Sequence, residues 1–153
     1  MITKSIPALL IAALATASIP AEPAPVSEKT VVITANDNMK FNVTRIEAQP
    51  GQKLHIVLRN EGTLPREVMS HNWILLKAGE NPTAYATAAL SAKTQNYQPP
   101  SLAGEVLAAI PLIGARKTGE VTFEAPTAPG TYPFLCSFPA HCQVGMRGEL
   151  VVK

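Results

Sequence analysis

The chain has 153 residues, of which 13 are basic and 11 acidic, and its formal net charge is +2. This length allows a single domain with a hydrophobic core large enough to be stable without a disulfide bond. The near balance of charge argues against a nucleic-acid binder, because such a protein needs a basic patch or stripe on its surface.

The N-terminus has the pattern of a secretory signal peptide. Lys4 precedes an apolar run from Ile6 to Ala17 that ends in small residues. The run is too short to span a bilayer as a mature helix. No cysteine lies near the cleavage site, so a lipid anchor is not expected, and the predicted location is the periplasm.

The predicted organisation has three parts. A Pro-rich stretch separates the signal peptide from the first strand pattern, and it is typical of a loose leader. The expected boundaries are residues 1–17 for the signal peptide, with Ala21 as the alternative end, residues 18–27 for a flexible leader and residues 28–153 for the folded domain.

Short runs of alternating apolar and polar residues, separated by Gly and Pro turns, dominate this domain. Such runs are typical of an all-β protein with a sandwich or barrel architecture. The expected strands cover residues 30–35, 43–48, 53–60, 73–77, 120–125, 131–136 and 148–152. One Ala-rich segment breaks the pattern: Asn81 and Pro82 suit the start of a helix over residues 83–93, which we expect to form a flap between strands.

Cys136, His141 and Met146 fall within one window of eleven residues. A thiolate, an imidazole and a thioether suit a soft, redox-active metal. Blue copper sites use all three, with two histidines and one cysteine near a plane and a weak axial methionine or backbone oxygen. The window therefore predicts one copper ion and requires a second histidine elsewhere in the chain.

The strand pattern indicates which histidine that is. Cys136 ends a predicted strand on the face that carries two large aromatic residues, so we expect its thiol to point into the core. His71 shares a strand face with Trp73 and Leu75, so it also points inward. His71 is therefore the expected partner of the ligands in the C-terminal window.

Several alternatives remain at this point. His55 lies on the outward face of its predicted strand, so a structural role is preferred for it. Cys142 could compete for the metal or form a disulfide with Cys136, but neighbouring loop residues cannot easily aim at one ion, so His141 is preferred. Zinc is the alternative metal, although methionine is a poor zinc ligand.

The chain resembles the cupredoxins, the blue copper proteins of the plastocyanin/azurin type. The His-Asn-Trp and Cys-x-Phe-Pro-x-His motifs are the specific signals. The matching segments follow in the right order over nearly the whole mature chain, at Asn36–Asn42, Leu64–Leu75, Leu112–Gly114, Val121–Glu124 and Cys136–His141.

This resemblance implies a Greek-key β-sandwich with a short helical flap and a copper ion, Cu(I)/Cu(II), near one end. It implies His71, Cys136 and His141 as ligands in the plane and Met146 as the axial ligand. It also implies that the Asn72 side chain ties the two ligand loops together by hydrogen bonds. The implied function is single-electron transfer rather than catalysis, with a copper storage or delivery protein as the alternative.

The resemblance further implies a monomer that docks a c-type cytochrome or a reductase near His141. The docking patch would consist of the apolar residues Met39, Leu64, Met69, Pro139 and Ala140. Two departures from azurins concern the metal loop: four residues separate His141 from Met146 where azurins have three, and Ala140 replaces a glycine. At Ser70, azurins typically have a glycine whose carbonyl approaches the metal.

Overall fold

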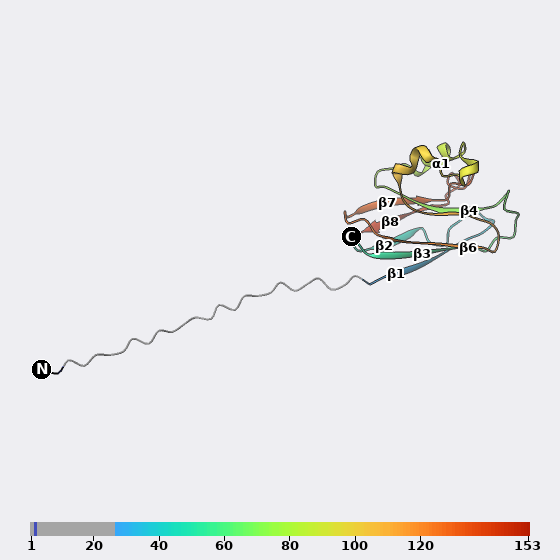
Figure 1. Cartoon of the computed structure of the whole chain (residues 1–153). Coiled ribbons are helices and arrows are strands. Elements are labelled where there is room, and N and C mark those ends of the chain that lie inside the picture. The colour runs from blue at the N-terminus through green and yellow to red at the C-terminus, as the bar shows by residue number, and fades with distance from the viewer. Residues whose placement is uncertain (1, 3–26) are drawn as a thin grey trace.

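Two β-sheets packed face to face, with one α-helix on the outside, form the fold (Figure 1). The computed structural model describes residue 2 and residues 27–153. The predicted signal peptide, apart from residue 2, and the leader up to residue 26 lie outside these residues. The all-β Greek-key sandwich with a helical flap is confirmed, whereas the domain boundaries stay predictions.

The two sheets differ in size. The three-stranded sheet has the order β1-β3-β6 and contains β1 (Lys29–Ala35), β3 (Lys53–Asn60) and β6 (Thr118–Glu124). The five-stranded sheet has the order β2-β8-β7-β4-β5 and contains β2 (Arg45–Ala48), β8 (Arg147–Val152), β7 (Gly130–Leu135), β4 (His71–Leu76) and β5 (Val106–Ile113). The pairs β1/β3 and β2/β8 are parallel and the other pairs are antiparallel.

The helix α1 (Pro82–Ala89) covers the outer face of the five-stranded sheet (Figure 1). It begins as predicted: the Asn81 side chain accepts hydrogen bonds from the first free backbone N–H groups, and Pro82 stands at the first position. It ends four residues earlier than expected, because the last N–H groups bond three residues back and the Ser91 hydroxyl caps the Ala88 carbonyl at 2.9 Å. Short 3-10 helices follow at Lys93–Gln95 and Pro100–Glu105.

The strand β5 is absent from the sequence-based prediction. Its sequence is a continuous apolar run with Pro111 inside it, and such a run cannot be assigned by periodicity alone. Proline is accepted here because β5 is the edge strand of its sheet, where one side needs no backbone donor. Strand β4 also begins two residues earlier than expected, at His71.

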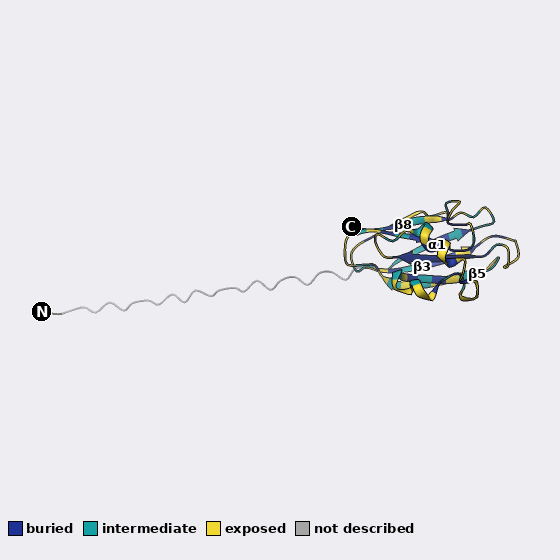
Figure 2. Ribbon diagram, turned by 90° about the horizontal axis from the view of Figure 1, so that it is seen from above, coloured by how far each residue is buried: buried dark blue, intermediate teal, exposed yellow. Residues whose placement is uncertain are grey.

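Two buried clusters lie on opposite faces of the five-stranded sheet, and Figure 2 shows buried segments alternating with exposed ones along the strands. Trp73 and Leu75 belong to the core between the sheets, together with Phe134 and Cys136. The alternate residues of the same strands pack beneath α1. The predicted inward faces of β4 and β7 are therefore confirmed, and the helix explains why β4 is buried on both faces.

Candidate metal centre

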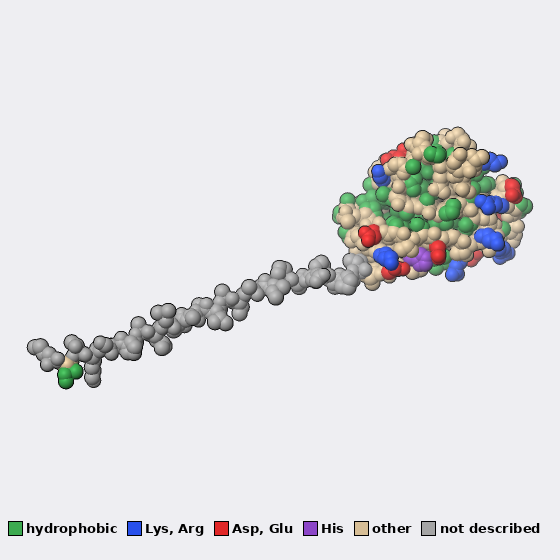
Figure 3. Space-filling view, viewed as in Figure 1, with side chains coloured by type: hydrophobic (Ala, Val, Ile, Leu, Met, Phe, Trp, Pro, Cys, Tyr) green, Lys and Arg blue, Asp and Glu red, His purple; other side chains and the backbone are tan. Residues whose placement is uncertain are grey.

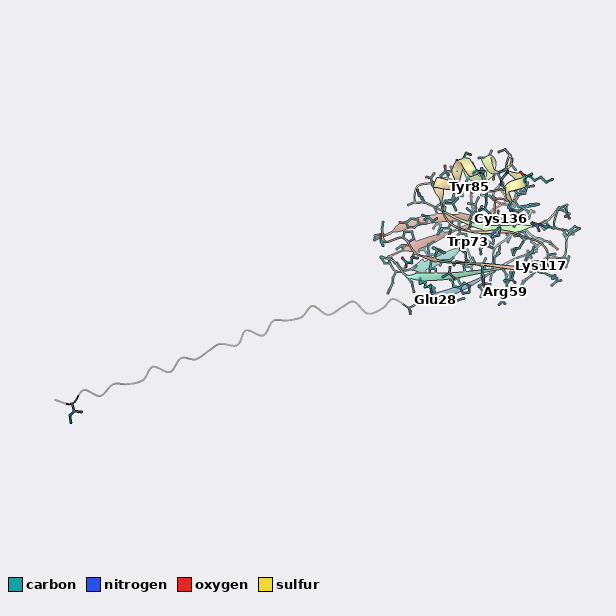
Figure 4. The ribbon with its side chains drawn as sticks, in the orientation of Figure 1. Glu28, Arg59, Trp73, Tyr85, Lys117 and Cys136 are labelled. Atoms are coloured by element: carbon teal, nitrogen blue, oxygen red, sulfur yellow. The ribbon has the colours of Figure 1, made fainter. Side chains whose placement is uncertain are left out.

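The fold brings the candidate ligands together at one end of the five-stranded sheet. His71 is the first residue of β4 and Cys136 follows the last residue of β7. These strands are antiparallel neighbours, with Ile74 opposite Leu135, so the start of one lies beside the end of the other. Figure 4 shows Cys136 above Trp73 and below the helix residue Tyr85. His141 is on the loop between β7 and β8.

Three donor atoms form a compact group. One ligating atom each of His71, Cys136 and His141 lies within 4.8 Å of the other two. The Cys136 Sγ is 3.5 Å from the His141 Nδ1, and the two imidazole ring centres are 5.0 Å apart. All three side chains are buried, with exposed fractions of 0%, 0% and 2%. This is a trigonal set of one sulfur and two nitrogen donors.

Burial keeps both imidazoles neutral. It lowers the pKa of His71 to about 4, against smaller opposing effects of the Asp37 charge and the Asn36 carbonyl. Burial also lowers the pKa of His141 to about 4, and the neighbouring His71 lowers it further. A neutral imidazole has a free lone pair at physiological pH, which is the form that binds a metal.

Burial acts in the opposite direction on the cysteine. It raises the pKa of the Cys136 thiol to about 12, although hydrogen bonds from the backbone N–H groups of Asn72 and Phe138 partly oppose this. A metal ion displaces the proton of a coordinating thiol outright. The two N–H groups then face a thiolate, which they stabilise by charge-assisted hydrogen bonds.

Orphaned nitrogen atoms show that this group suits a metal. Neither ring nitrogen of His71 has a hydrogen-bond partner. The Asn36 carbonyl is close enough to raise the pKa of the ring slightly but does not accept a hydrogen bond from it. A buried polar atom without a partner costs about 1–3 kcal/mol. A cation shared with Cys136 and His141 would satisfy the ring, and the donor set suits copper.

The comparisons with known proteins agree with this geometry. A family model described as copper binding proteins, plastocyanin/azurin family, matches residues 27–153. The chain belongs to this family. The azurin of Pseudomonas fluorescens biotype A is 35% identical over 130 residues, which are 83% of this chain and all of that protein. Auracyanin-A of Chloroflexus aurantiacus is 38% identical over 76% of this chain and 69% of its own.

Solved structures give the same assignment. Auracyanin A from Chloroflexus aurantiacus, described as a blue copper protein, superposes with a TM-score of 0.73 at 36% identity, over 83% of this chain and all of that one. The reduced auracyanin of Roseiflexus castenholzii superposes with a TM-score of 0.72 at 30% identity, over 81% and 96% of the two chains. The predicted family and its copper cofactor are thus confirmed.

Met146 lies at the end of the metal loop and is fully buried in the core. Its backbone closes the loop in two places: its carbonyl accepts from the Cys136 N–H at 3.0 Å, and its own N–H donates to the His141 carbonyl at 2.9 Å. The metal loop is therefore held by backbone hydrogen bonds at both Cys136 and His141. That the thioether binds copper axially stays a prediction, as does the approach of the Ser70 carbonyl.

Hydrogen bonds of Asn72 join the two ligand segments as the resemblance implied. Its Oδ1 accepts from the Ser137 N–H at 2.8 Å, and its Nδ2 donates to the Ser137 hydroxyl at 2.8 Å. The Ser137 hydroxyl donates in turn to the Tyr97 carbonyl at 2.6 Å. Since Asn72 follows His71 and Ser137 follows Cys136, this network holds two of the candidate ligands in place.

His55 and Cys142, which the sequence analysis did not favour as ligands, are not part of the group of three donor atoms. His55 is on the outer face of β3, where its Nε2 is 3.2 Å from a Glu120 carboxylate oxygen. Cys142 is a free thiol in the cluster beneath α1, with its Sγ 3.5 Å from the Pro82 carbonyl. Cys136 is also a free cysteine, so the disulfide alternative is wrong.

Sequence reasoning missed the roles of two residues around the site. The Phe138 ring packs against the His141 ring at a centroid distance of 4.8 Å. The Lys40 ammonium donates to the Val144 carbonyl and so ties the metal loop to the segment after β1. Phe138 lies within the recognised Cys-x-Phe-Pro-x-His motif, whereas no sequence signal indicates Lys40. Ala140 adopts a positive φ of 70°, which agrees with its replacing a glycine.

Proposed function

We propose that this protein is a periplasmic electron carrier with one blue copper site. His71, Cys136 and His141 would hold the metal in the plane and Met146 would be the axial ligand. The buried group of these three donors, with its orphaned imidazole, is the observation that carries the proposal. The signal-peptide pattern of residues 1–17 supports the location.

When bound, copper supplies a one-electron couple between Cu(I) and Cu(II). The protein contributes donor side chains whose positions are fixed by the surrounding strands and hydrogen bonds. His71 belongs to a strand buried on both faces, Cys136 ends another, and the side chain of Asn72 locks them together. Ligands held in this way favour similar geometries in both oxidation states, which keeps the cost of reorganisation small.

His141 is the proposed exit for the electron. It is the only one of the three donors with a measurable exposed fraction, 2%, and it lies on a loop rather than in a sheet. The residues of the predicted apolar docking patch are half-buried or exposed. They are Met39, Leu64, Met69, Pro139 and Ala140. We propose that a c-type cytochrome or a reductase docks a monomer of this protein here.

No helix among the described residues is long and apolar enough to cross a membrane.

The visible spectrum of the copper-loaded protein tests the proposed function. We expect an intense band from charge transfer between the Cys136 thiolate and copper. Cys136→Ser should abolish this band, while the matched variant Cys142→Ser should keep it. A colourless copper-loaded protein, or a band that depends on Cys142, would contradict the assigned ligands.

Voltammetry separates the carrier from a storage or delivery protein. We expect a reversible one-electron wave and slow loss of copper to an added chelator, because three buried donors enclose the metal. Rapid transfer of copper to the chelator without a reversible wave would favour storage or delivery.

A further inference from the structure

Five exposed cationic side chains lie at the same end of the sandwich as the metal centre. This set is called the basic arc here. It consists of Arg59, Arg66, Lys93, Arg116 and Lys117. Figure 4 labels two of them, Arg59 and Lys117, at the end of the sandwich that lies away from the C-terminus, and Figure 3 shows most Lys and Arg side chains of this face gathered there.

The members of the arc are neighbours in space. Arg66 and Lys93 line one shallow cleft. The Arg66 side chain also lies over Gly114, at the start of the turn that carries Arg116 and Lys117. This turn is bonded to Asn60 by backbone hydrogen bonds of 2.9 Å on each side, which places it next to Arg59. The arc is therefore continuous from the cleft to the end of β3.

These cations have no ionic partners within the described residues 27–153. The ion pairs found there involve Lys53 with Glu28, His55 with Glu120, and Arg45 and Lys153 with nearby glutamates. None includes a member of the arc. Asp37, an acidic residue near this end, is already occupied by the Thr63 N–H and hydroxyl at 2.9 and 3.0 Å.

Acidic residues are sparse near the arc. Glu61 and Glu67 lie on the adjoining loop, and Glu67 lines the same cleft as Arg66 and Lys93. Glu120 is a diagonal neighbour of Arg59 across the β3/β6 pair and contacts His55. The five cations outnumber these three glutamates and Asp37. The field at this end of the molecule is consequently positive, although the whole chain is close to neutral.

The arc adjoins the proposed electron exit. Phe138 lines the cleft of Arg66 and Lys93, and its ring packs against that of His141. A partner seated over His141 would thus touch the arc on one side. Unpaired charges at the rim of a docking site steer an oppositely charged partner and raise its association rate.

We propose that the basic arc is the electrostatic docking surface for a redox protein with an acidic face. The inference rests on the proposed function, since it concerns docking at the same copper site. One electron passes from the reduced partner to the oxidised copper site, so the partner is oxidised and copper is reduced. No bond forms or breaks in this step.

Stopped-flow kinetics with reduced plant-type ferredoxin, an acidic one-electron donor, test the proposal. The copper-loaded protein should react with a second-order rate constant that falls about tenfold or more as ionic strength rises from about 0.01 to 0.5 M, because salt shortens the Debye length from about 30 Å to a few ångström. With a basic c-type cytochrome as donor, the rate should not fall with salt. A rate with ferredoxin that does not depend on salt would overturn the proposal.

A pair of matched variants locates the effect. Arg66→Gln combined with Lys117→Gln should lower the ferredoxin rate about fivefold at low ionic strength. The control combines Lys77→Gln with Lys153→Gln, which remove the same charge at the other end of the sandwich, and should change the rate less than twofold. If both double variants lower the ferredoxin rate equally, the rate depends on the net charge of the protein and not on the position of the arc, and the proposal is wrong.

Two further outcomes are distinguishable. In the first outcome, the arc substitutions weaken co-sedimentation of the protein with phosphatidylglycerol vesicles but leave the rate with ferredoxin unchanged. The arc then binds an anionic membrane and the proposal is wrong. If the copper-loaded protein accepts no electron from either donor, the proposed function itself fails. If the protein accepts electrons at a rate that does not depend on salt, the proposed electron-carrier function stands and only the proposed role of the arc is wrong.

Discussion

Met146 is part of both the buried core and the metal loop. Replacing it by leucine preserves volume and apolar character, so we expect the protein to lose less than about 1.5 kcal/mol of stability. The substitution removes a soft donor that helps set the potential. Met146→Leu should therefore retain copper and raise the reduction potential, as measured by voltammetry. An unchanged potential and spectrum would show that Met146 is core filling only.

Ala140 adopts a left-handed backbone in the loop before His141, with a φ of 70°. This conformation costs a residue with a Cβ about 1–2 kcal/mol. Ala140→Gly removes that cost but adds about 0.4–1 kcal/mol of chain entropy to the unfolded state. We expect urea denaturation to show a net gain of about 0.5–1 kcal/mol.

The matched control is Ala84→Gly, at an exposed position of α1 with ordinary helical backbone. Glycine in a helix lowers stability by about 0.5–1 kcal/mol relative to alanine. The two alanine-to-glycine changes should thus have opposite signs. A loss of stability in both variants would contradict the strain assigned to Ala140.

At the scale of elements, the side chain of Asn72 connects β4 to the segment that follows β7. Asn72→Ala leaves the buried Ser137 N–H without its acceptor and removes the N–H donor to the Ser137 hydroxyl, which keeps its bond to the Tyr97 carbonyl. Loss of such partners costs about 1–3 kcal/mol, and loss of a group that orients metal ligands costs about 10-fold to 100-fold in metal affinity. Urea denaturation and competition with a copper chelator measure the two effects.

Asn38→Ala is the control for this tie. Asn38 is exposed and contributes its backbone N–H, rather than its side chain, to a hydrogen bond with the Asn36 side chain. We expect a change of less than about 0.5 kcal/mol, as for most surface substitutions. If Asn72→Ala behaves like this control, the network does not position the ligands.

For the whole molecule, copper and the fold should stabilise each other. Cys136 and His141 come from one loop, but His71 lies far away in sequence, so the complete set of donors exists only in the folded state. Free copper at about 100 times its dissociation constant stabilises a folded protein by about 2.7 kcal/mol. For a domain of this size, the melting temperature should rise by about 10 °C.

Differential scanning calorimetry with and without copper measures this shift. In Cys136→Ser the same copper concentration should give a much smaller shift, since the thiolate is missing. An equal shift in the variant would place the stabilising copper at another site.

The sequence by itself determined the family, the β-sandwich and the identity of the candidate donors. The motif of Cys136 and His141 is local, because six consecutive residues carry it, and the alternation of β7 orients the thiol inward. His71 could be chosen because the same period of two applies to Trp73 and Leu75. Such signals survive in a sequence because they depend on neighbours along one strand or one loop.

Only the tertiary structure decided the rest. It showed that β5 is a strand, because β5 pairs with β4 at the edge of the sheet, where a proline is tolerated. It also placed Cys142 in the cluster beneath α1. It also assembled the basic arc from three separate parts of the chain: the end of β3 with the loop after it, the 3-10 helix at Lys93–Gln95, and the turn of Arg116 and Lys117. These features depend on which segments become neighbours in space, and the burial and fields that result are not written in any local pattern.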